Sequence, residues 1–412
     1  MQTNLADFIK GTPEGDEADA ILRACVHCGF CTATCPTYQL LGDELDGPRG
    51  RIYLIKQVLE GVEPTRKTQL HLDRCLTCRN CESTCPSGVK YGRLADIGRR
   101  VVEARVPRTL KNRIKRSTLK EFLPRTSLFK PAFRAGTAMR ALLPRGLRDK
   151  LQPARDPGHW PTRTHARKML VLEGCVQPAM GPNINAATAR VLDALGVQLL
   201  VAPKAGCCGA VRFHMNDQDG GLADMRRNID AWWPYVEQVE AIVMTASGCG
   251  VTVKDYGHLL AHDPHYAAKA ARVSMLTRDL SEILPQFEAQ LALQMEGKSA
   301  QRVAFHPPCT LQHGQQIRGK VEHVLRAVGV DVVLCVDSHL CCGSAGTYSV
   351  LHPEIAHALR DRKLENLEAT GASEIVSANI GCMTHLQSGT DTPVTHWIEL
   401  VDRMLARARA AA

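Results

Sequence analysis

The stretch CVHCGFCTATCP at residues 25–36 has a near copy, CLTCRNCESTCP, at residues 75–86, and this pair decides the fold of the N-terminal part of the chain. Both follow the spacing Cys-x2-Cys-x2-Cys-x3-Cys-Pro, the bacterial run for [4Fe–4S] clusters. The two-residue gaps let one tight loop offer three thiolates, the soft ligands that iron–sulfur clusters prefer. Structural zinc usually needs only two Cys-x2-Cys pairs. The duplicated run therefore predicts two [4Fe–4S] clusters.

The fourth cysteine of each run is predicted to cross to the other cluster. The first cluster is then expected on Cys25, Cys28, Cys31 and Cys85, and the second on Cys75, Cys78, Cys81 and Cys35. This exchange links the two loops and keeps two one-electron centres close together. Two such centres favour a role in electron transfer over one in the conversion of an organic substrate. Arg74 and Arg79 flank the first three cysteines of the second run, and we expect their charge to raise the potential of a nearby cluster.

Eight further cysteines form an internal repeat, Cys175, Cys207, Cys208 and Cys249 followed by Cys309, Cys341, Cys342 and Cys382. The doublet follows the first cysteine by 32 positions in both copies, and the last cysteine follows the doublet by 41 and then 40. Such self-similarity indicates two copies of one supersecondary unit. Because adjacent side chains on a strand point to opposite faces, each doublet is expected in a loop, with Gly209 or Gly343 allowing a sharp bend.

This pattern resembles the CCG domain of heterodisulfide reductase B-type subunits, in which a Cys-x2-Cys closes each motif and the site holds a non-cubane cluster. Here Thr252 and His385 stand where the closing cysteines would be. Two interpretations of these eight cysteines therefore stay open. They form an additional cluster or redox site, or they are buried thiols. Cys335 lies outside both sets and is expected in the core.

From residue 168 onward, short apolar segments alternate with helical patterns, which predicts α/β units and a largely parallel sheet. The cysteines lie at or just beyond the ends of the predicted strands, where such sheets place their sites, and this favours a site shared between the repeats. The fold class is thus a multidomain α+β and α/β chain, mainly helical first and then with two α/β CCG units. The expected segments are a ferredoxin-like domain 1–100, a basic amphipathic linker 101–168, a first CCG repeat 169–270, a connecting helix 271–300 and a second CCG repeat 301–412.

The composition, with 44% apolar and 23% charged residues, is typical of a folded globular chain. Seventeen cysteines without an evident export signal predict a reducing, cytoplasmic compartment in which thiols serve metals or catalysis. No segment reaches the ~18 consecutive apolar residues of a membrane-spanning helix. The chain also lacks a GxGxxG, a Walker A or a Gly-x-Ser-x-Gly motif, so no nucleotide, flavin or hydrolase site is expected on it.

The net charge of +9 is a local feature, because residues 99–168 hold 20 Lys and Arg against four Asp and Glu. Pro124, Pro131 and Pro144 are expected to break this segment into short helices. Three interpretations stay open: an anchor on anionic lipid, a docking surface for an acidic partner subunit, and a solvated linker held to the next domain by Leu and Phe. No recognised nucleic-acid module accompanies the charge, so no nucleic-acid partner is expected.

Several segments together resemble the iron–sulfur subunits of bacterial glycolate oxidase: residues 21–61, 73–88, 228–234, 245–250, 337–348 and 378–382. The resemblance implies a complex in which two flavoprotein-type subunits, carrying FAD, oxidise glycolate to glyoxylate, with D-lactate as a side substrate. It implies that this chain passes the electrons to a membrane acceptor such as quinone, from a peripheral position on the cytoplasmic face of the inner membrane. The alternatives are a heterodisulfide-reductase-like thiol/disulfide enzyme and an assembly or regulatory protein that senses oxygen through labile clusters.

Overall fold

The computed structural model describes residues 1–142, 151–295 and 301–410. By its internal contacts the chain divides into a first unit, Met1–Ser117 with His339–Lys363, and a second unit, Thr118–Ser338 with Leu364–Ala412. The first unit contains both N-terminal cysteine runs, and the second contains all the β-strands. Two helices, α8 (Leu110–Phe122) and α22 (Pro353–Glu368), span boundaries between the two units.

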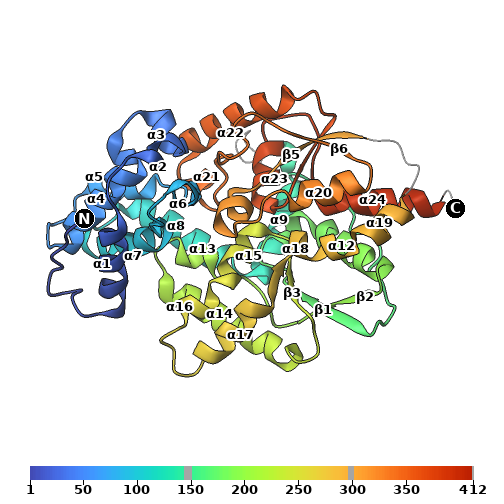
Figure 1. Cartoon of the computed structure of the whole chain (residues 1–412), viewed down its shortest axis with the longest axis horizontal. Helices are drawn as coiled ribbons and strands as arrows, with labels where there is room; N and C mark the ends of the chain where they lie inside the picture. The colour runs from blue at the N-terminus through green and yellow to red at the C-terminus, as the bar shows by residue number, and fades with distance from the viewer. Residues whose placement is uncertain (143–150, 296–300, 411–412) are drawn as a thin grey trace. The chain divides into compact units, whose positions relative to one another are not determined.

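Helices alone build the N-terminal part of the first unit, drawn in blue in Figure 1. They are α1 (Pro13–Ala24), α2 (Phe30–Ala33), α3 (Pro36–Leu41), η1 (Glu44–Asp46), α4 (Pro48–Leu59), α5 (Arg66–Asp73), α6 (Asn80–Thr84) and α7 (Tyr91–Arg105), and the C-terminal part adds α21 (Tyr348–Leu351). Helix α4 lies between the two cysteine runs. Both α3 and α4 begin at a proline, whose missing N–H costs nothing in the first turn of a helix.

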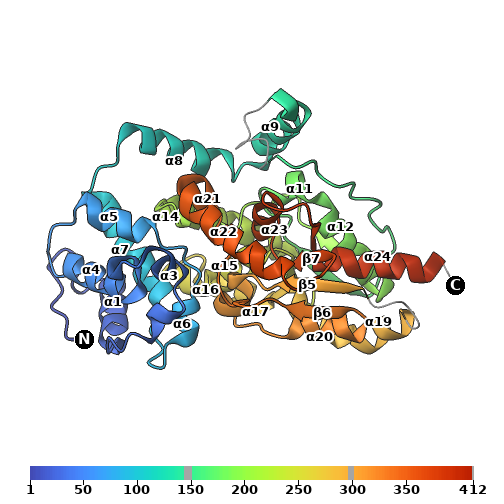
Figure 2. The ribbon, with the colours of Figure 1, turned by 90° about the horizontal axis from the view of Figure 1, so that it is seen from above.

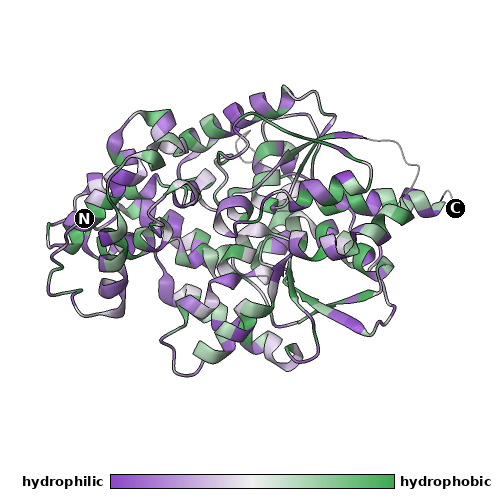
Figure 3. Cartoon of the chain, viewed as in Figure 1, coloured by the Kyte–Doolittle hydropathy of each residue, from purple (hydrophilic) through white to green (hydrophobic). Residues whose placement is uncertain are grey.

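The core of the first unit forms where α7 packs against α1, α4 and α5. Ile55 and Leu59 of α4 and Leu94 of α7 are fully buried there. Figure 3 shows hydrophobic and hydrophilic stretches alternating along these helices, as expected when one face of each helix is turned to a core. This core holds the loops with the cysteine runs, because α1 ends at Ala24, directly before Cys25, and α7 begins at Tyr91, shortly after Cys85.

The second unit contains two four-stranded sheets with identical topology and only parallel pairs. The first has the order β2-β1-β3-β4, with β1 (Arg167–Val171), β2 (Val197–Val201), β3 (Ile242–Met244) and β4 (Thr277–Asp279). The second has the order β6-β5-β7-β8, with β5 (Arg302–His306), β6 (Asp331–Leu334), β7 (Glu374–Ser377) and β8 (Val394–His396). The matching order confirms the predicted repeat, the parallel sheets and the fold class.

Helices surround both sheets. Those linked to the first sheet are α11 (Gln177–Met180), α12 (Pro182–Ala194), α13 (Ala210–Phe213), α14 (Gln218–Trp232), η3 (Trp233–Tyr235), α15 (Ser247–Lys254), α16 (Tyr256–Leu259) and α17 (Ala267–Leu276). Those linked to the second are η5 (Thr310–Gly314), α20 (Lys320–Ala327), α23 (Ile380–Gln387) and α24 (Trp397–Ala410). Figure 2 shows α12 of the first repeat beside α24 of the second, so the repeats pack directly on each other. None of the helices in the described ranges is both long and apolar enough to cross a membrane.

The basic segment after the first unit's core forms helices rather than an extended linker. Helix α8 ends before Pro124 as predicted, whereas Pro131 lies inside α9 (Thr126–Ala138), which corrects the prediction of a break there. Phe129 and Phe133, on either side of this proline, are buried against Ala179 of the first repeat, and their packing stabilises the helix despite the proline. After α9 comes η2 (Arg140–Leu142), and Pro144 lies outside the described residues.

The segment predicted as one connecting helix, 271–300, is divided in the structure. It contains the end of α17, strand β4, α18 (Leu280–Ile283), η4 (Leu284–Phe287) and α19 (Glu288–Gln294). Buried Thr277 and Asp279 of β4 extend the first sheet, and Asp279 caps α18 through a hydrogen bond from Ser281 N. The domain limits predicted from the sequence remain a proposal.

The two sheets meet at their carboxyl ends. Ser247 N, after β3, donates a hydrogen bond to Ala378 O, after β7, over 3.1 Å. His396, the last residue of β8, is fully buried, and its Nε2 lies 2.9 Å from Thr245 O. Helices α15 and α23, which carry Cys249 and Cys382, begin at this junction. Contacts between the repeats therefore lie at the sheet edge where the sequence predicts a shared site.

His396 makes the second unit sensitive to acid. Burial lowers the pKa of His396 to about 3, and Ile398 N donates to its Nδ1, so the folded state holds a neutral ring. The unfolded ring titrates near 6.5. As the pH is lowered, the ring therefore takes up a proton in the unfolded state before it does so in the folded state. The free energy of unfolding falls as the pH drops from about 6.5 toward 3. Between about pH 7 and pH 5 we expect a loss of about 2 kcal/mol that His396→Gln does not show. Urea unfolding followed by the fluorescence of buried Trp232 measures it, and equal losses in both proteins would contradict the assignment.

Candidate iron–sulfur centres

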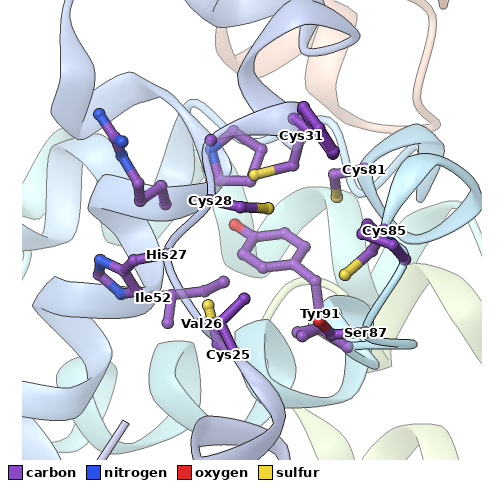
Figure 4. A pocket seen from close by; sticks show the side chains of 16 residues that line it. Cys25, Val26, His27, Cys28, Cys31, Ile52, Cys81, Cys85, Ser87 and Tyr91 are labelled. Atoms are coloured by element: carbon purple, nitrogen blue, oxygen red, sulfur yellow. The ribbon is translucent and has the colours of Figure 1, made fainter.

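The first predicted ligand set lines one cavity in the first unit. Cys25, Cys28, Cys31 and Cys85 all line it, and Figure 4 shows their sulfur atoms around it. The ring of Tyr91 also lines this space. The crossing of the fourth cysteine, predicted from the run, is thus compatible with the geometry, because Cys85 comes from the second run and the other three from the first.

The second predicted set lines a separate cavity. Its walls include Cys35 from the first run together with Cys75, Cys78 and Cys81 from the second. Cys81 and Tyr91 line both cavities, so the two spaces share a wall. The role of each cysteine as a ligand remains a prediction, and the chemistry of these walls, with soft sulfur donors on every side, fits iron–sulfur clusters.

The two runs bend in the same way around their second cysteine. The residues before and after Cys28, His27 and Gly29, have φ of 56° and 88°, and the equivalent residues Thr77 and Arg79 have φ of 52° and 59°. Alternating left-handed residues turn successive backbone N–H groups toward one side, where they form a concavity for anionic groups. Thr77 N accordingly donates to Cys75 Sγ over 3.4 Å. The sequence signals this bend only at Gly29.

A buried amide joins the two runs. Asn80, which is 2% exposed, donates from Nδ2 to Thr34 O of the first run over 3.0 Å and to His339 O over 3.2 Å. Tyr348 OH donates to Arg74 O over 2.9 Å. The segment that holds the second cysteine doublet, His339–Lys363, therefore packs within the first unit beside the second run. Nothing in the spacing of the cysteines predicts this contact.

Crowding and burial disfavour free thiolates at three of these positions. Burial raises the pKa of Cys31 to about 11, with a further rise from the neighbouring Cys25, and burial also raises the pKa of Cys25 and of Cys81. For Cys75, burial also favours the thiol, but the charges of Arg51 and Arg99 outweigh it and lower the pKa. A cationic iron–sulfur group in each cavity would offset the repulsion between neighbouring thiolates.

Of the two arginines predicted beside a cluster, Arg79 lines the second cavity, with Nε 3.3 Å from Glu82 Oε2. Arg74 is not among the lining residues, and its Nη1 lies 2.8 Å from Asp46 Oδ2. Arg51, which is 1% exposed, lines the same cavity and was not predicted. Only the basic sequence GPRGR around it could have hinted at this position.

The four cysteines of the first repeat come together in the second unit. Their thiols form a hydrogen-bonded chain in the order Cys175, Cys207, Cys208, Cys249. Because Cys175 and Cys208 donate to Cys207, the pKa of Cys207 lies well below its usual value while the pKa values of its two donors are well above it. The site is largely buried. Asn228 donates to Cys207 O over 2.8 Å and so stabilises the loop that carries the doublet.

The cysteines of the second repeat are divided between the units: Cys341 and Cys342 belong to the first, and Cys309 and Cys382 to the second. Gly343 N donates to Cys341 Sγ over 3.4 Å. Cys335 is buried, as predicted for a core cysteine. Thr252, in place of a closing cysteine, donates to Gly248 O within its own helix.

Both doublets lie in loops that follow the second strand of each repeat, as predicted. The following glycines, Gly209 and Gly343, have φ of 92° and 89°. A Cβ on Gly209 would lie 2.7 Å from Gly221 O, and one on Gly343 would lie 2.5 Å from Ala356 O. Only glycine fits these bends, because both the left-handed conformation and the close backbone exclude a side chain.

A helical unit with two adjoining cysteine-lined cavities, joined in one chain to two cysteine-rich α/β repeats, defines an iron–sulfur protein of the electron-transfer class. Comparison with protein families agrees: the 4Fe-4S dicluster domain matches residues 21–89, and the cysteine-rich domain matches residues 169–254 and 303–387. The dicluster match implies two [4Fe–4S] clusters in the first unit.

Known proteins extend the comparison to the full chain. The glycolate oxidase iron–sulfur subunit of Escherichia coli K12 is 56% identical over 410 residues, which cover 99% of this chain and 100% of that protein. The probable glycolate oxidase iron–sulfur subunit of Bacillus subtilis 168 is 31% identical over 90% of this chain and 89% of its own. Lactate utilization protein A of Geobacillus thermodenitrificans is 24% identical over 53% of this chain and 90% of its own. The chain belongs to the family of glycolate oxidase iron–sulfur subunits.

The doublet loop of the first repeat offers a direct test of its geometry. Gly209→Ala should lower the free energy of unfolding of the second unit by about 1–3 kcal/mol more than Gly174→Ala. Gly174 is the matched control, since it also has a positive φ (79°) but no atom lies within 4 Å of an added Cβ. Urea unfolding followed by the fluorescence of Trp232 measures both variants. Equal losses would show that the close approach to Gly221 O does not constrain the loop.

Proposed function

We propose that this chain is the electron-transfer subunit of a complex that oxidises glycolate to glyoxylate, with D-lactate as a side substrate. The observation that carries the proposal is the pair of cysteine-lined cavities that share Cys81 and Tyr91, in a chain whose family is that of glycolate oxidase iron–sulfur subunits. Two redox centres on either side of one wall suit transfer of single electrons, which is what [4Fe–4S] clusters supply.

The proposed ligands follow the two cavities. Cys25, Cys28, Cys31 and Cys85 hold the first cluster, and Cys75, Cys78, Cys81 and Cys35 hold the second. Tyr91 OH donates a hydrogen bond to Cys75 Sγ over 3.5 Å at the second site, while Thr37 Oγ1, which donates to Asp46 O over 2.8 Å, lies 3.3 Å from Cys35 Sγ. Such hydrogen bonds to sulfur, with burial, tune the potential of a cluster.

The oxidation itself is assigned to partner subunits. Glycolate loses two electrons and two protons when it becomes glyoxylate, and FAD on two flavoprotein-type subunits accepts them. The electrons then leave one at a time through this chain to a respiratory acceptor such as a quinone, which takes up two electrons and two protons as it becomes a quinol. We place the complex in the cytoplasm, at the periphery of the inner membrane, and no nucleic acid takes part.

The first CCG repeat is proposed to bind an additional metal centre. Four cysteine thiols linked in a chain, the buried Cys175, Cys207 and Cys208 and the half-buried Cys249, provide a set of four soft donors even without a closing cysteine. The same contacts favour a second candidate function, a heterodisulfide-reductase-like thiol/disulfide enzyme, because Cys175 and Cys207 are within hydrogen-bond reach of each other. Disulfide reduction by the isolated chain would support that candidate over electron transfer.

The electron-transfer proposal is tested with Cys78→Ser in the assembled complex. We expect glycolate-driven reduction of quinone to fall at least a hundredfold, while the flavoprotein subunits still reduce an artificial dye, because only the path through this chain is interrupted. Cys335→Ala, at a buried cysteine outside all four groups, is the control and should keep both reactions. Loss of the dye reaction in Cys78→Ser would show that the chain serves assembly, and unchanged quinone reduction would exclude it from the electron path.

A further inference from the structure

We propose that two buried arginines, Arg51 and Arg99, set the direction of electron flow by raising the reduction potential of the group held by Cys75, Cys78, Cys81 and Cys35 above that of the group held by Cys25, Cys28, Cys31 and Cys85. This inference rests on the ligand sets given under the proposed function. It adds an order of reduction potentials to the two ligand sets. Because the second site has the higher potential, a single electron on this chain resides there.

Arg51 reaches the second cavity from α4. Its guanidinium lines that cavity, donates from Nη1 to Thr37 Oγ1 over 3.1 Å, and donates from Nε to His71 O over 2.7 Å. Thr37 Oγ1 in turn lies 3.3 Å from Cys35 Sγ. One hydroxyl group therefore separates a buried positive charge from a predicted ligand sulfur.

Arg99 supports the same site from α7. It is 7% exposed, and it donates from Nη2 to Cys75 O over 2.6 Å and from Nη1 to Thr77 Oγ1 over 2.8 Å. Nε and Nη2 also donate to Leu72 O. These acceptors are neutral, and no carboxylate in the described ranges lies within salt-bridge distance of Arg99. Its charge therefore acts on the second site, and more weakly on the carboxylate of Asp73, which pairs with Arg108 and Arg116.

The first cavity has a weaker counterpart. Arg49, on the same helix as Arg51, lines the first cavity, but its side chain is 38% exposed and its Nε lies 2.6 Å from Glu44 Oε1. Solvent and a carboxylate both screen this charge. The two sites thus have the same kind of sulfur donors but differ in the buried positive charge beside them.

The second site also includes one opposing charge. Asp46 is fully buried, with Oδ1 at 3.4 Å from Arg51 Nη2 and Oδ2 at 2.8 Å from Arg74 Nη1. One carboxylate between two guanidinium groups leaves a net positive charge beside the cavity. A buried positive charge stabilises the reduced cluster, which carries one more electron, and a low local dielectric strengthens the effect.

The experiment is a redox titration of the anaerobically purified complex, followed by low-temperature EPR. Cys28→Ser and Cys78→Ser first assign the two [4Fe–4S] waves, because each variant removes one ligand from one of the two sets. In the unmodified protein, the wave lost in Cys78→Ser should have the higher midpoint. Arg51→Gln and Arg99→Gln should each make that wave at least tenfold harder to reduce, a shift of about 59 mV for one electron.

Matched variants separate charge from structural damage. Arg51→Lys keeps the charge and should shift the second wave less than Arg51→Gln, and Arg49→Gln should leave both waves nearly in place. Asp46→Asn removes the opposing charge and should move the second wave in the other direction, toward easier reduction. Loss of packing alone does not predict opposite signs for Arg51→Gln and Asp46→Asn.

Three negative results would have different meanings. If iron is present at about eight atoms per chain or more and both waves are seen, but Arg51→Gln and Arg99→Gln leave the second wave unmoved, this inference is wrong while the electron-transfer function stands. If the second wave has the lower midpoint in the unmodified protein, the proposed order is also wrong. If no [4Fe–4S] signal develops in the unmodified complex, the proposed function itself fails.

Discussion

Everything in the first unit depends on bringing eight thiols from two loops around two adjoining cavities. Thiolates placed so closely repel one another, and burial adds a further penalty, as the raised pKa values of Cys25, Cys31 and Cys81 indicate. A cationic metal group offsets both costs. Three features hold the two loops around adjoining cavities. They are the helical core, the left-handed residues in both runs and the amide of Asn80.

The second unit also brings cysteines together, but it does so with parallel sheets instead of helices. Parallel strands direct their carboxyl ends to one edge, and the loops that leave this edge carry the cysteines. In the first repeat, the doublet bends at Gly209 so that two adjacent thiols reach the same chain of hydrogen bonds. The sheets meet through His396 and Thr245, which makes one body of two repeats with the same strand order. The first repeat therefore gathers four cysteine thiols into one chain of contacts.

The sequence predicts those features that depend on local spacing. The cysteine runs indicate which residues line each cavity, and the alternation of apolar segments and helices predicts two parallel sheets. It fails where distant contacts decide: Pro131 stays inside a helix because Phe129 and Phe133 pack on the first repeat, and β4 interrupts the expected connecting helix because Thr277 pairs with Ile242. It also indicates Arg79, which lines the second cavity, but not Arg51, which the fold brings to the same cavity from α4.

The central claim, that this chain conducts electrons released from glycolate, is tested most directly by low-temperature EPR of the anaerobic complex before and after glycolate is added. The account predicts that glycolate alone produces the signals of reduced [4Fe–4S] clusters, without any added chemical reductant. If dithionite reduces the clusters but glycolate leaves them silent, the chain does not lie on the path of electrons from glycolate, and the claim is contradicted.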